Sequence, residues 1–315
     1  MQYKNWWLAA AGCAMLTLST AAHGALLVND RWADGTDSDP ASPTYSEMGV
    51  DSDSDGDLES AWFRGGDGTL DPVGAGGPLR GSFSSSTSAS SASWTTYFTP
   101  ESNKVNLANS GDQLRVTWAF TPQNVNASNG SQNFRVALVD TPNGARPVAD
   151  SNPPSGAYAG YALFLNFGQT TGRATPFQLL ERTAASGDLL GASGNWGGAV
   201  NAAGFGNGAV GYGNDVPYEL VMTLTRNGSA LDIAATMSGG NINGTGSVSV
   251  STTDASPSSF IYDTFALRPS GATTTAEHFN TSLFRVEFIP AVPEPASLSL
   301  LGCAALAGLL IARRK

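Results

Sequence analysis

The sequence predicts an all-β fold built as an antiparallel sandwich. Six segments are rich in β-branched and aromatic residues and have the length of strands: 114–120, 134–139, 158–167, 177–182, 218–226 and 283–288. Turns rich in Gly, Asn, Pro and Ser separate them, and no segment between the two ends of the chain has convincing helical periodicity. Many short strands with such turns are typical of a two-sheet sandwich.

The segment 218–226 shows the strand pattern most clearly. Leu220, Met222 and Leu224 occupy every second position, as in a strand with one buried face. Asn227-Gly228 then separates this segment from a second strand-like run, 230–238. Asn-Gly between two such runs predicts a β-hairpin, because both residues tolerate positive φ.

Both ends of the 315-residue chain have the character of processing segments. We divide the chain into a signal peptide over residues 1–24, a β-sandwich domain over 25–290 and a sorting segment over 291–315. The middle part is long enough for one large β domain. On length alone, two small domains remain an alternative.

Charge and cysteine content narrow the range of partners. Between the two ends the chain has 12 cations against 25 acids. Nucleic acid and anionic lipid need a basic surface, so we expect no nucleic-acid partner and expect divalent cations instead. Cys13 and Cys303 both lie in the end segments, so the middle part can form neither a disulfide nor a thiolate metal site.

The N-terminus has the order of a secretory signal peptide. Lys4 precedes an apolar stretch over residues 6–18, and small residues follow, with Ala22-His23-Gly24 as the expected cleavage site. This order predicts a signal helix, export through the secretion translocon and removal by signal peptidase.

The C-terminus joins a short polar motif, an apolar run and a basic end. Residues 296–312 are mainly apolar and approach the length of a transmembrane helix, which needs about 20 residues. The basic end would stay in the cytoplasm, so the domain would face outward. A plain membrane anchor is one interpretation. The motif and basic residues are Val292, Pro293, Glu294, Pro295, Arg313, Arg314 and Lys315.

This arrangement resembles the PEP-CTERM sorting signal. All three parts occur in order and at the terminus, over about 24 residues. The resemblance implies that an exosortase-type enzyme in the inner membrane of a Gram-negative bacterium processes the tail near the Pro-Glu-Pro motif. It also implies that the protein then reaches the cell surface or the extracellular matrix of a biofilm. The prolines would keep the motif extended, as a protease substrate requires.

The middle part has a more diffuse resemblance to concanavalin A-like jelly-roll domains of the lectin or laminin-G type. The segments that carry it are 30–35, 60–63, 111–116 and 262–268. The resemblance implies a jelly-roll sandwich and says little about activity.

The acidic segment 51–59 resembles the first half of a D-x-D-x-D-G calcium loop. Gly56 takes the sixth position, where such a loop turns sharply, and Leu58 takes the apolar eighth position. The twelfth position is Trp62, so the usual bidentate carboxylate is missing unless a distant acid or water replaces it. A solvated acidic loop is the alternative. The candidate Ca²⁺ ligands are Asp51, Asp53, Asp55, Asp57 and Glu59.

Two low-complexity stretches are expected to be connections. Residues 191–215 are Gly-rich and contain Trp196, Phe205 and Tyr212, which could stack on sugar rings if the loop exposes them. A simple long connection is the alternative. Residues 82–93 are nearly all Ser, Thr and Ala, so a loop or polar edge strand is expected, with O-glycosylation as the alternative.

Catalytic constellations are not evident in the middle part. It has one histidine, His278, which excludes a multi-histidine zinc site. It has neither a G-x-S-x-G elbow nor an E-x-D-x-E cluster on one strand. We therefore expect a non-enzymatic surface or matrix protein, with binding or structural work and extracellular polysaccharide as a candidate partner. The alternatives are a secreted polysaccharide-active hydrolase on the same fold and a purely structural envelope protein.

Overall fold

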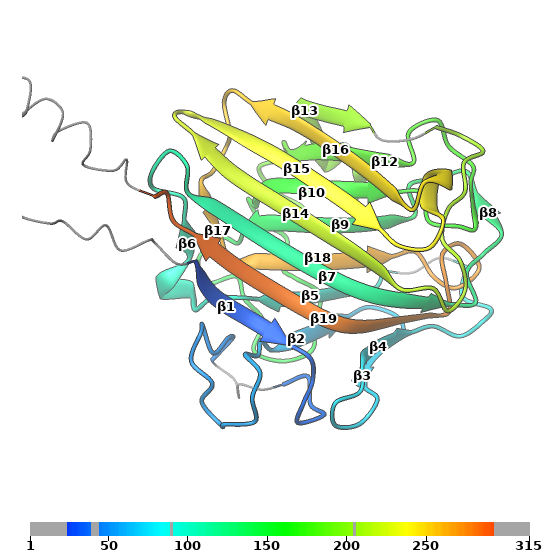
Figure 1. Ribbon diagram of the computed structural model, residues 1–315, viewed down its shortest axis with the longest axis horizontal. Helices are drawn as coiled ribbons and strands as arrows, with labels where there is room; N and C mark the ends of the chain where they lie inside the picture. The colour runs from blue at the N-terminus through cyan, green and yellow to red at the C-terminus, as the bar shows by residue number, and fades with distance from the viewer. Residues whose placement is uncertain (1–23, 39–43, 89–90, 204–205, 293–315) are drawn as a thin grey trace, which may run out of the picture. The chain divides into compact units, whose positions relative to one another are not determined.

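Two antiparallel β-sheets pack face to face in the computed structural model, which describes residues 24–38, 44–88, 91–203 and 206–292 (Figure 1). This establishes the predicted all-β sandwich. The predicted signal helix and transmembrane helix lie outside the described residues. Within those residues, no helix combines the length and the apolar character that crossing a membrane demands.

The first sheet has eight strands, with β19 at its centre. On one side β19 pairs with β7 along its whole length; on the other it pairs with β4 through residues 278–281 and with β1 through residues 284–288. The strands of this sheet are β16 (Ser247–Asp254), β15 (Ala230–Ser238), β14 (Tyr218–Asn227), β7 (Gln113–Gln123), β19 (His278–Ile289), β4 (Leu79–Ser82), β3 (Thr69–Pro72) and β1 (Ala25–Asp30).

The second sheet has seven strands and forms the other layer in Figure 1. In order across the sheet they are β13 (Trp196–Ala203), β12 (Phe177–Arg182), β10 (Ala159–Leu165), β9 (Phe134–Asp140), β18 (Thr264–Pro269), β5 (Ser93–Tyr97) and β2 (Trp62–Gly65). Short elements complete the chain: β6 (Val105–Asn106) with β17 (Ile261–Tyr262), β8 (Ser128–Asn129) with β11 (Thr170–Thr171), and the 3₁₀ turns η1 (Glu101–Asn103), η2 (Ser193–Asn195) and η3 (Ile242–Gly244).

Each of the six segments predicted as strands contains a strand. The predicted hairpin is also present, because β14 and β15 pair in register up to Asn227 and Ala230. Its two loop residues are Gly228 and Ser229, and of these only Gly228 has a positive φ, of 63°. A positive φ at the first central position alone is the pattern of a type II′ turn. Asn227 is the last residue of β14, so the Asn-Gly pair contributes one of its two residues to the loop.

Alternating side chains of the strands fill the space between the sheets. Leu220, Met222 and Leu224 of β14 are all at most 1% exposed, while the residues between them are partly exposed. Trp118 of β7 is fully buried and donates a hydrogen bond from Nε1 to Thr281 Oγ1 of β19 at 3.0 Å. The main core is one continuous cluster with both sheets as its walls, and two smaller buried clusters lie apart from it; residues 24–291 contain all three.

The two low-complexity stretches differ in outcome. The Ser-rich stretch joins β4 to β5, so its described residues form a connection, as expected. The Gly-rich stretch 191–215 is more than a connection, because it supplies η2 and the edge strand β13. β13 pairs with β12 from Gln178 to Arg182, with an irregularity after Leu180. Backbone pairing at a sheet edge needs no large side chain, so the Gly-rich composition concealed the strand.

A buried ionic network ties the second sheet to the loops at one end. Asp263, which has no exposed surface, accepts a hydrogen bond from the Arg146 guanidinium at 2.7 Å and lies 3.3 Å from Lys104 Nζ. Its second oxygen accepts the backbone N–H of Thr141 at 2.9 Å. Arg146 also lies over the ring of Tyr97, 4.8 Å from the centroid. Asp263 thus pairs with both cations, and Lys104 has a second partner in Asp140 at 2.7 Å.

The Asp263→Asn variant should lose stability heavily. The amide keeps the shape of the carboxylate but leaves the buried Arg146 without its counter-charge and Lys104 with Asp140 alone. Breaking a buried pair in this way costs about 3–5 kcal/mol. Urea denaturation with linear extrapolation measures the change. Asp150→Asn is the matched control, because the Arg64–Asp150 pair is exposed (38% and 50%) and such pairs contribute at most about 1 kcal/mol. Equal losses in the two variants would show that the network is not a stabilising centre.

Candidate functional site

An acidic segment joins β1 of the first sheet to β2, the edge strand of the second sheet. Residues 30–59 contain ten acids and one cation, Arg31. Backbone hydrogen bonds fix the segment's course: Asn29 donates to the Leu58 carbonyl at 2.7 Å, and Glu47 donates to the Glu59 carbonyl at 3.2 Å. The carboxylates over residues 44–59 are therefore held on an ordered path rather than spread along a free loop.

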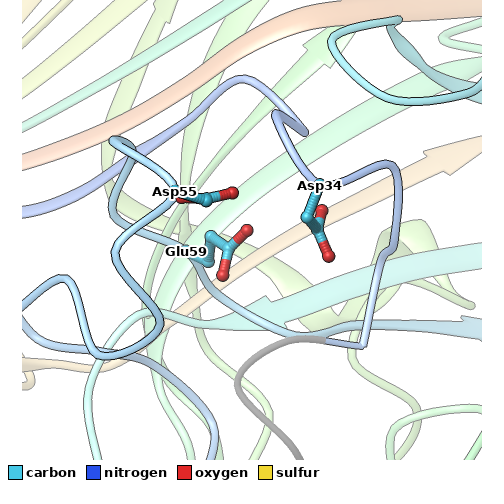
Figure 2. Close-up of side chains that lie close together, drawn as sticks. All are labelled: Asp34, Asp55 and Glu59. Carbon is cyan, nitrogen blue, oxygen red and sulfur yellow. The ribbon is translucent and has the colours of Figure 1, made fainter.

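Six of these acids form two clusters of three. In the first cluster, Asp34, Asp55 and Glu59 each offer an oxygen, and the three oxygens lie within 4.8 Å of one another. Figure 2 shows these side chains facing a common space, with Asp34 on the segment after β1 and the other two on the segment before β2. Oxygens that bind one Ca²⁺ at about 2.4 Å can be at most about 4.8 Å apart. The spacing therefore fits a single cation.

The second cluster consists of Glu47, Asp51 and Asp53, under the same distance limit. Asp51 also shapes the turn, because its two oxygens accept the backbone N–H groups of Ser54 at 2.6 Å and Gly56 at 3.2 Å. Gly56 has a φ of 102°, which favours glycine, as the loop pattern predicts. The two clusters share the turn 51–56 as a common scaffold.

Asp57 lies beside the first cluster and is only 4% exposed. Its Oδ2 accepts the backbone N–H of Arg31 at 2.9 Å and of Ala33 at 3.3 Å. Its Oδ1 is buried and has no hydrogen-bond partner among the described residues, and the same holds for Asp55 Oδ2. A buried carboxylate oxygen without a donor is costly unless a cation is present.

The carboxylates crowd each other without nearby cations. Burial, and then the charge of Asp57, raises the pKa of Asp30 well above its ordinary value. Burial, and then the hydrogen-bonding contact with Asp57, raises the pKa of Asp55. None of the ion pairs found in the described part of the chain involves Asp30, Asp34, Asp55 or Asp57. A cation bound among these carboxylates would therefore reduce their mutual repulsion.

The structure divides the five predicted calcium ligands among three roles. Asp51 and Asp53 belong to one cluster, Asp55 and Glu59 belong to the other, and Asp57 caps backbone N–H groups. Position twelve of the predicted loop, Trp62, is 4% exposed and packs into the core. Sequence reasoning missed Asp34 and Glu47, which complete the clusters from a distance, and no local spacing could have identified them.

The predicted aromatic ligand-binding residues do not form a surface. Trp196 is 6% exposed and its Nε1 donates to the Leu189 carbonyl at 3.2 Å. Tyr212 is 1% exposed and stacks on Phe167, with ring centroids 3.9 Å apart. Phe205 lies outside the described residues. Trp196 and Tyr212 are interior residues, so the prediction that they stack on sugar rings from a loop is wrong, because packing rather than exposure explains aromatics among these glycines.

The C-terminus matches a family model. Residues 291–315 match the PEP-CTERM protein-sorting motif. The chain therefore carries this motif, as its terminal sequence indicated, and the motif implies an exported protein that an exosortase sorts to the cell surface. The motif residues Pro293 to Lys315 lie outside the described residues, and Val292 is 65% exposed. No curated protein matches the chain.

Solved structures that resemble the chain include lectins. Arcelin-5, a lectin-like defence protein from Phaseolus vulgaris, has 12% sequence identity and a TM-score of 0.41, over 72% of this chain and 92% of its own. The Lotus tetragonolobus seed lectin has 9% identity and a TM-score of 0.38, over 74% and 94%. The exoplasmic/lumenal domain of VIP36, in a form bound to Ca²⁺ and Man3GlcNAc, has 12% identity and a TM-score of 0.40, over 76% and 87%. Similarity this distant carries no information about the ligand of this chain.

The Tyr212→Ala variant tests the interior position of this ring. Removing a buried, stacked aromatic should cost about 3–5 kcal/mol, from lost burial and the cavity left behind. Chemical denaturation measures the change in the free energy of unfolding. Val210→Ala is the control in the same stretch, because Val210 is 45% exposed and should change stability by less than about 0.5 kcal/mol. A Tyr212→Ala protein as stable as the control would mean that the ring is not part of the core.

Proposed function

We propose that this chain is a non-enzymatic protein of the cell surface or extracellular matrix of a Gram-negative bacterium, and that its sandwich binds carbohydrate. The observation that carries the proposal is the PEP-CTERM motif over residues 291–315. In this proposal the apolar segment holds the chain in the inner membrane until the exosortase acts. The folded part then performs its work outside the cell.

The arrangement of carboxylates supports binding rather than hydrolysis. A hollow on the outer face of the eight-stranded sheet includes Glu219 and Glu287. Glu219 lies opposite Ala119 of β7, and Glu287 lies opposite Arg115 of the same strand. Four residues along a strand span about 13 Å, which exceeds the roughly 5–9.5 Å that separates the carboxyl groups of glycoside hydrolases.

A second pair of acids is interior. Glu181 is 8% exposed and Asp254 has no exposed surface. Asp254 accepts a hydrogen bond from the Tyr161 hydroxyl at 2.8 Å, and Glu181 accepts the backbone N–H of Ser258 at 3.2 Å. Neither carboxylate can reach a polymeric substrate, which weighs against the alternative of a polysaccharide hydrolase.

Sorting can be tested by changing the motif while the folded part stays intact. In a host with an exosortase, the wild-type chain should lose its tail and reach the surface or the medium. A variant with Pro293→Ala, Glu294→Ala and Pro295→Ala should keep its full length and stay in the inner membrane. Cell fractionation with mass measurement of the product distinguishes the two outcomes.

Deletion of residues 293–315 is the control for secretion and folding. The shortened chain should be exported in soluble form in hosts with or without an exosortase. A triple variant that is still cut and released like the wild type would contradict sorting through this motif.

We further propose that the acidic segment binds Ca²⁺. Two observations support this: the oxygens of each cluster lie within the diameter of one coordination shell, and the buried Oδ1 of Asp57 has no donor among the described residues. Hard cations prefer carboxylate ligands. In this proposal Asp34, Asp55 and Glu59 hold one ion, with Glu47, Asp51 and Asp53 available to a second.

Thermal unfolding of residues 24–291 tests the calcium proposal. A site with a Kd of about 10⁻⁴ M would stabilise the fold by about 2.7 kcal/mol at 10 mM Ca²⁺, because the ion binds the native state alone. We expect the Tm to rise by several degrees relative to a chelator, and this rise to disappear in the Asp34→Asn, Asp55→Asn double variant. Asp67→Asn, an exposed acid outside both clusters, should keep the rise. An unchanged Tm at millimolar Ca²⁺ would contradict this proposal and favour the interpretation of the segment as a solvated acidic loop.

A further inference from the structure

The chain leaves the folded unit just after β19, and a buried carboxylate holds it at that point. The last residue pair of the ladder is Ile289 with Gln113, and Pro290 has no N–H that could extend it. Beyond this proline, the backbone N–H of Ala291 donates to Asp112 Oδ1 at 2.8 Å. The folded unit ends at Ala291.

Asp112 is a firm anchor for the end of the chain, because it is 1% exposed and bonded on several sides. Its Oδ2 accepts the backbone N–H of Asn109 at 2.7 Å, and its own carbonyl accepts the backbone N–H of Arg226 at 2.9 Å. Hydrogen bonds to a carboxylate are roughly twice as strong as those between neutral groups. The first residue beyond this anchor is Val292, which is 65% exposed.

Very little chain separates the anchor from the sorting motif. Val292 is the single residue between Ala291 and Pro293, where Pro-Glu-Pro begins. Two residues extend the chain by at most about 7 Å. An enzyme that acts at the motif therefore cannot work at a distance from the fold, and it must approach the surface from which the chain leaves.

Two loops surround this point and form the exit rim, which consists of residues 108–111 and 227–229. Gly111 lies against Ala291, since a Cβ on this glycine would be 3.1 Å from the Ala291 Cβ. The backbone N–H of Gly228 donates to Ser110 Oγ at 3.0 Å and so joins the two loops. In Figure 1 the end of β19 lies beside the start of β1, with which it pairs.

The exit rim differs in charge from the rest of the surface. Each of its residues is exposed, uncharged and no larger than Asn, although the chain has a net charge of −10. Another protein can cover such a surface without removing a charge from water, which would be costly. Protein interfaces are likewise depleted of charged residues at their centre.

We infer that the exit rim is the docking surface for the exosortase-type membrane enzyme that processes the tail. The inference rests on the proposed sorting function and names the part of the folded unit that this partner meets. Two independent observations carry it: the Asp112 anchor leaves one residue between the fold and the motif, and the surface around the anchor is uncharged.

The rate of tail removal from the full chain tests the inference in a host with an exosortase. Ala108→Glu with Ser229→Glu places two carboxylates on exposed positions of the rim. Removal should slow about tenfold or more, because the contact would bury charges that have no partner. Ser249→Glu with Ser251→Glu, at two exposed positions of β16, is the matched control and should keep the wild-type rate. Pulse–chase labelling with mass measurement of the product gives both rates.

A spacer separates an effect on docking from an effect on folding. Six residues of alternating Gly and Ser between Ala291 and Val292 lengthen the chain by up to about 20 Å. In chains with this spacer, the Ala108→Glu, Ser229→Glu variant should lose its tail as fast as the chain without these substitutions, because the enzyme need not approach the rim. A photoreactive residue in place of Ser229 should also crosslink to a tagged, catalytically inactive exosortase, and one in place of Ser251 should not.

The outcomes separate the inference from the proposal on which it rests. A rim variant that loses its tail at the wild-type rate would overturn the docking surface. Slow removal that persists with the spacer would overturn it too, since the defect would then not depend on approach to the rim. Crosslinks from position 229 to lipid alone would show that the rim faces the bilayer and not the enzyme. If the wild-type chain itself keeps its tail, the proposed sorting fails, and this result appears without any substitution in the rim.

Discussion

The apolar layer between the two sheets is the constraint on which the rest of the structure depends. No cysteine lies in the described residues, so side-chain packing and hydrogen bonds hold the layers together without a disulfide. Aromatic rings carry much of this contact: Phe134 of β9 lies 5.7 Å from Trp118 of β7 and 5.1 Å from Phe279 of β19, between ring centroids. A shift of one residue in any of these strands would turn the rings outward, so packing and strand register fix each other.

Because the core fixes the strands, the connections between them can carry charged residues. Two of these connections differ in how their charges are balanced. At Asp263 a single carboxylate serves Arg146 and Lys104, and all three groups are compensated inside the protein. In the segment before β2, carboxylates face one another, and the buried Asp57 Oδ1 has no donor in the described part of the chain. The first arrangement balances its charges within the protein, whereas the second has no ion pair with a cation among the described residues. The contrast is what supports the proposal of a cation at the acidic segment.

Local patterns made the strands predictable, and their limits explain what was missed. The alternation at Leu220, Met222 and Leu224 identifies a strand whatever its neighbours are, and Asn227-Gly228 identifies a hairpin. The edge strand β13 was hidden because pairing by backbone groups leaves no mark on a Gly-rich sequence. Trp196 was misinterpreted because an aromatic residue among glycines gives no sign of whether it faces solvent or the core. Asp34 and Glu47 reach their clusters only through the path of the chain in three dimensions.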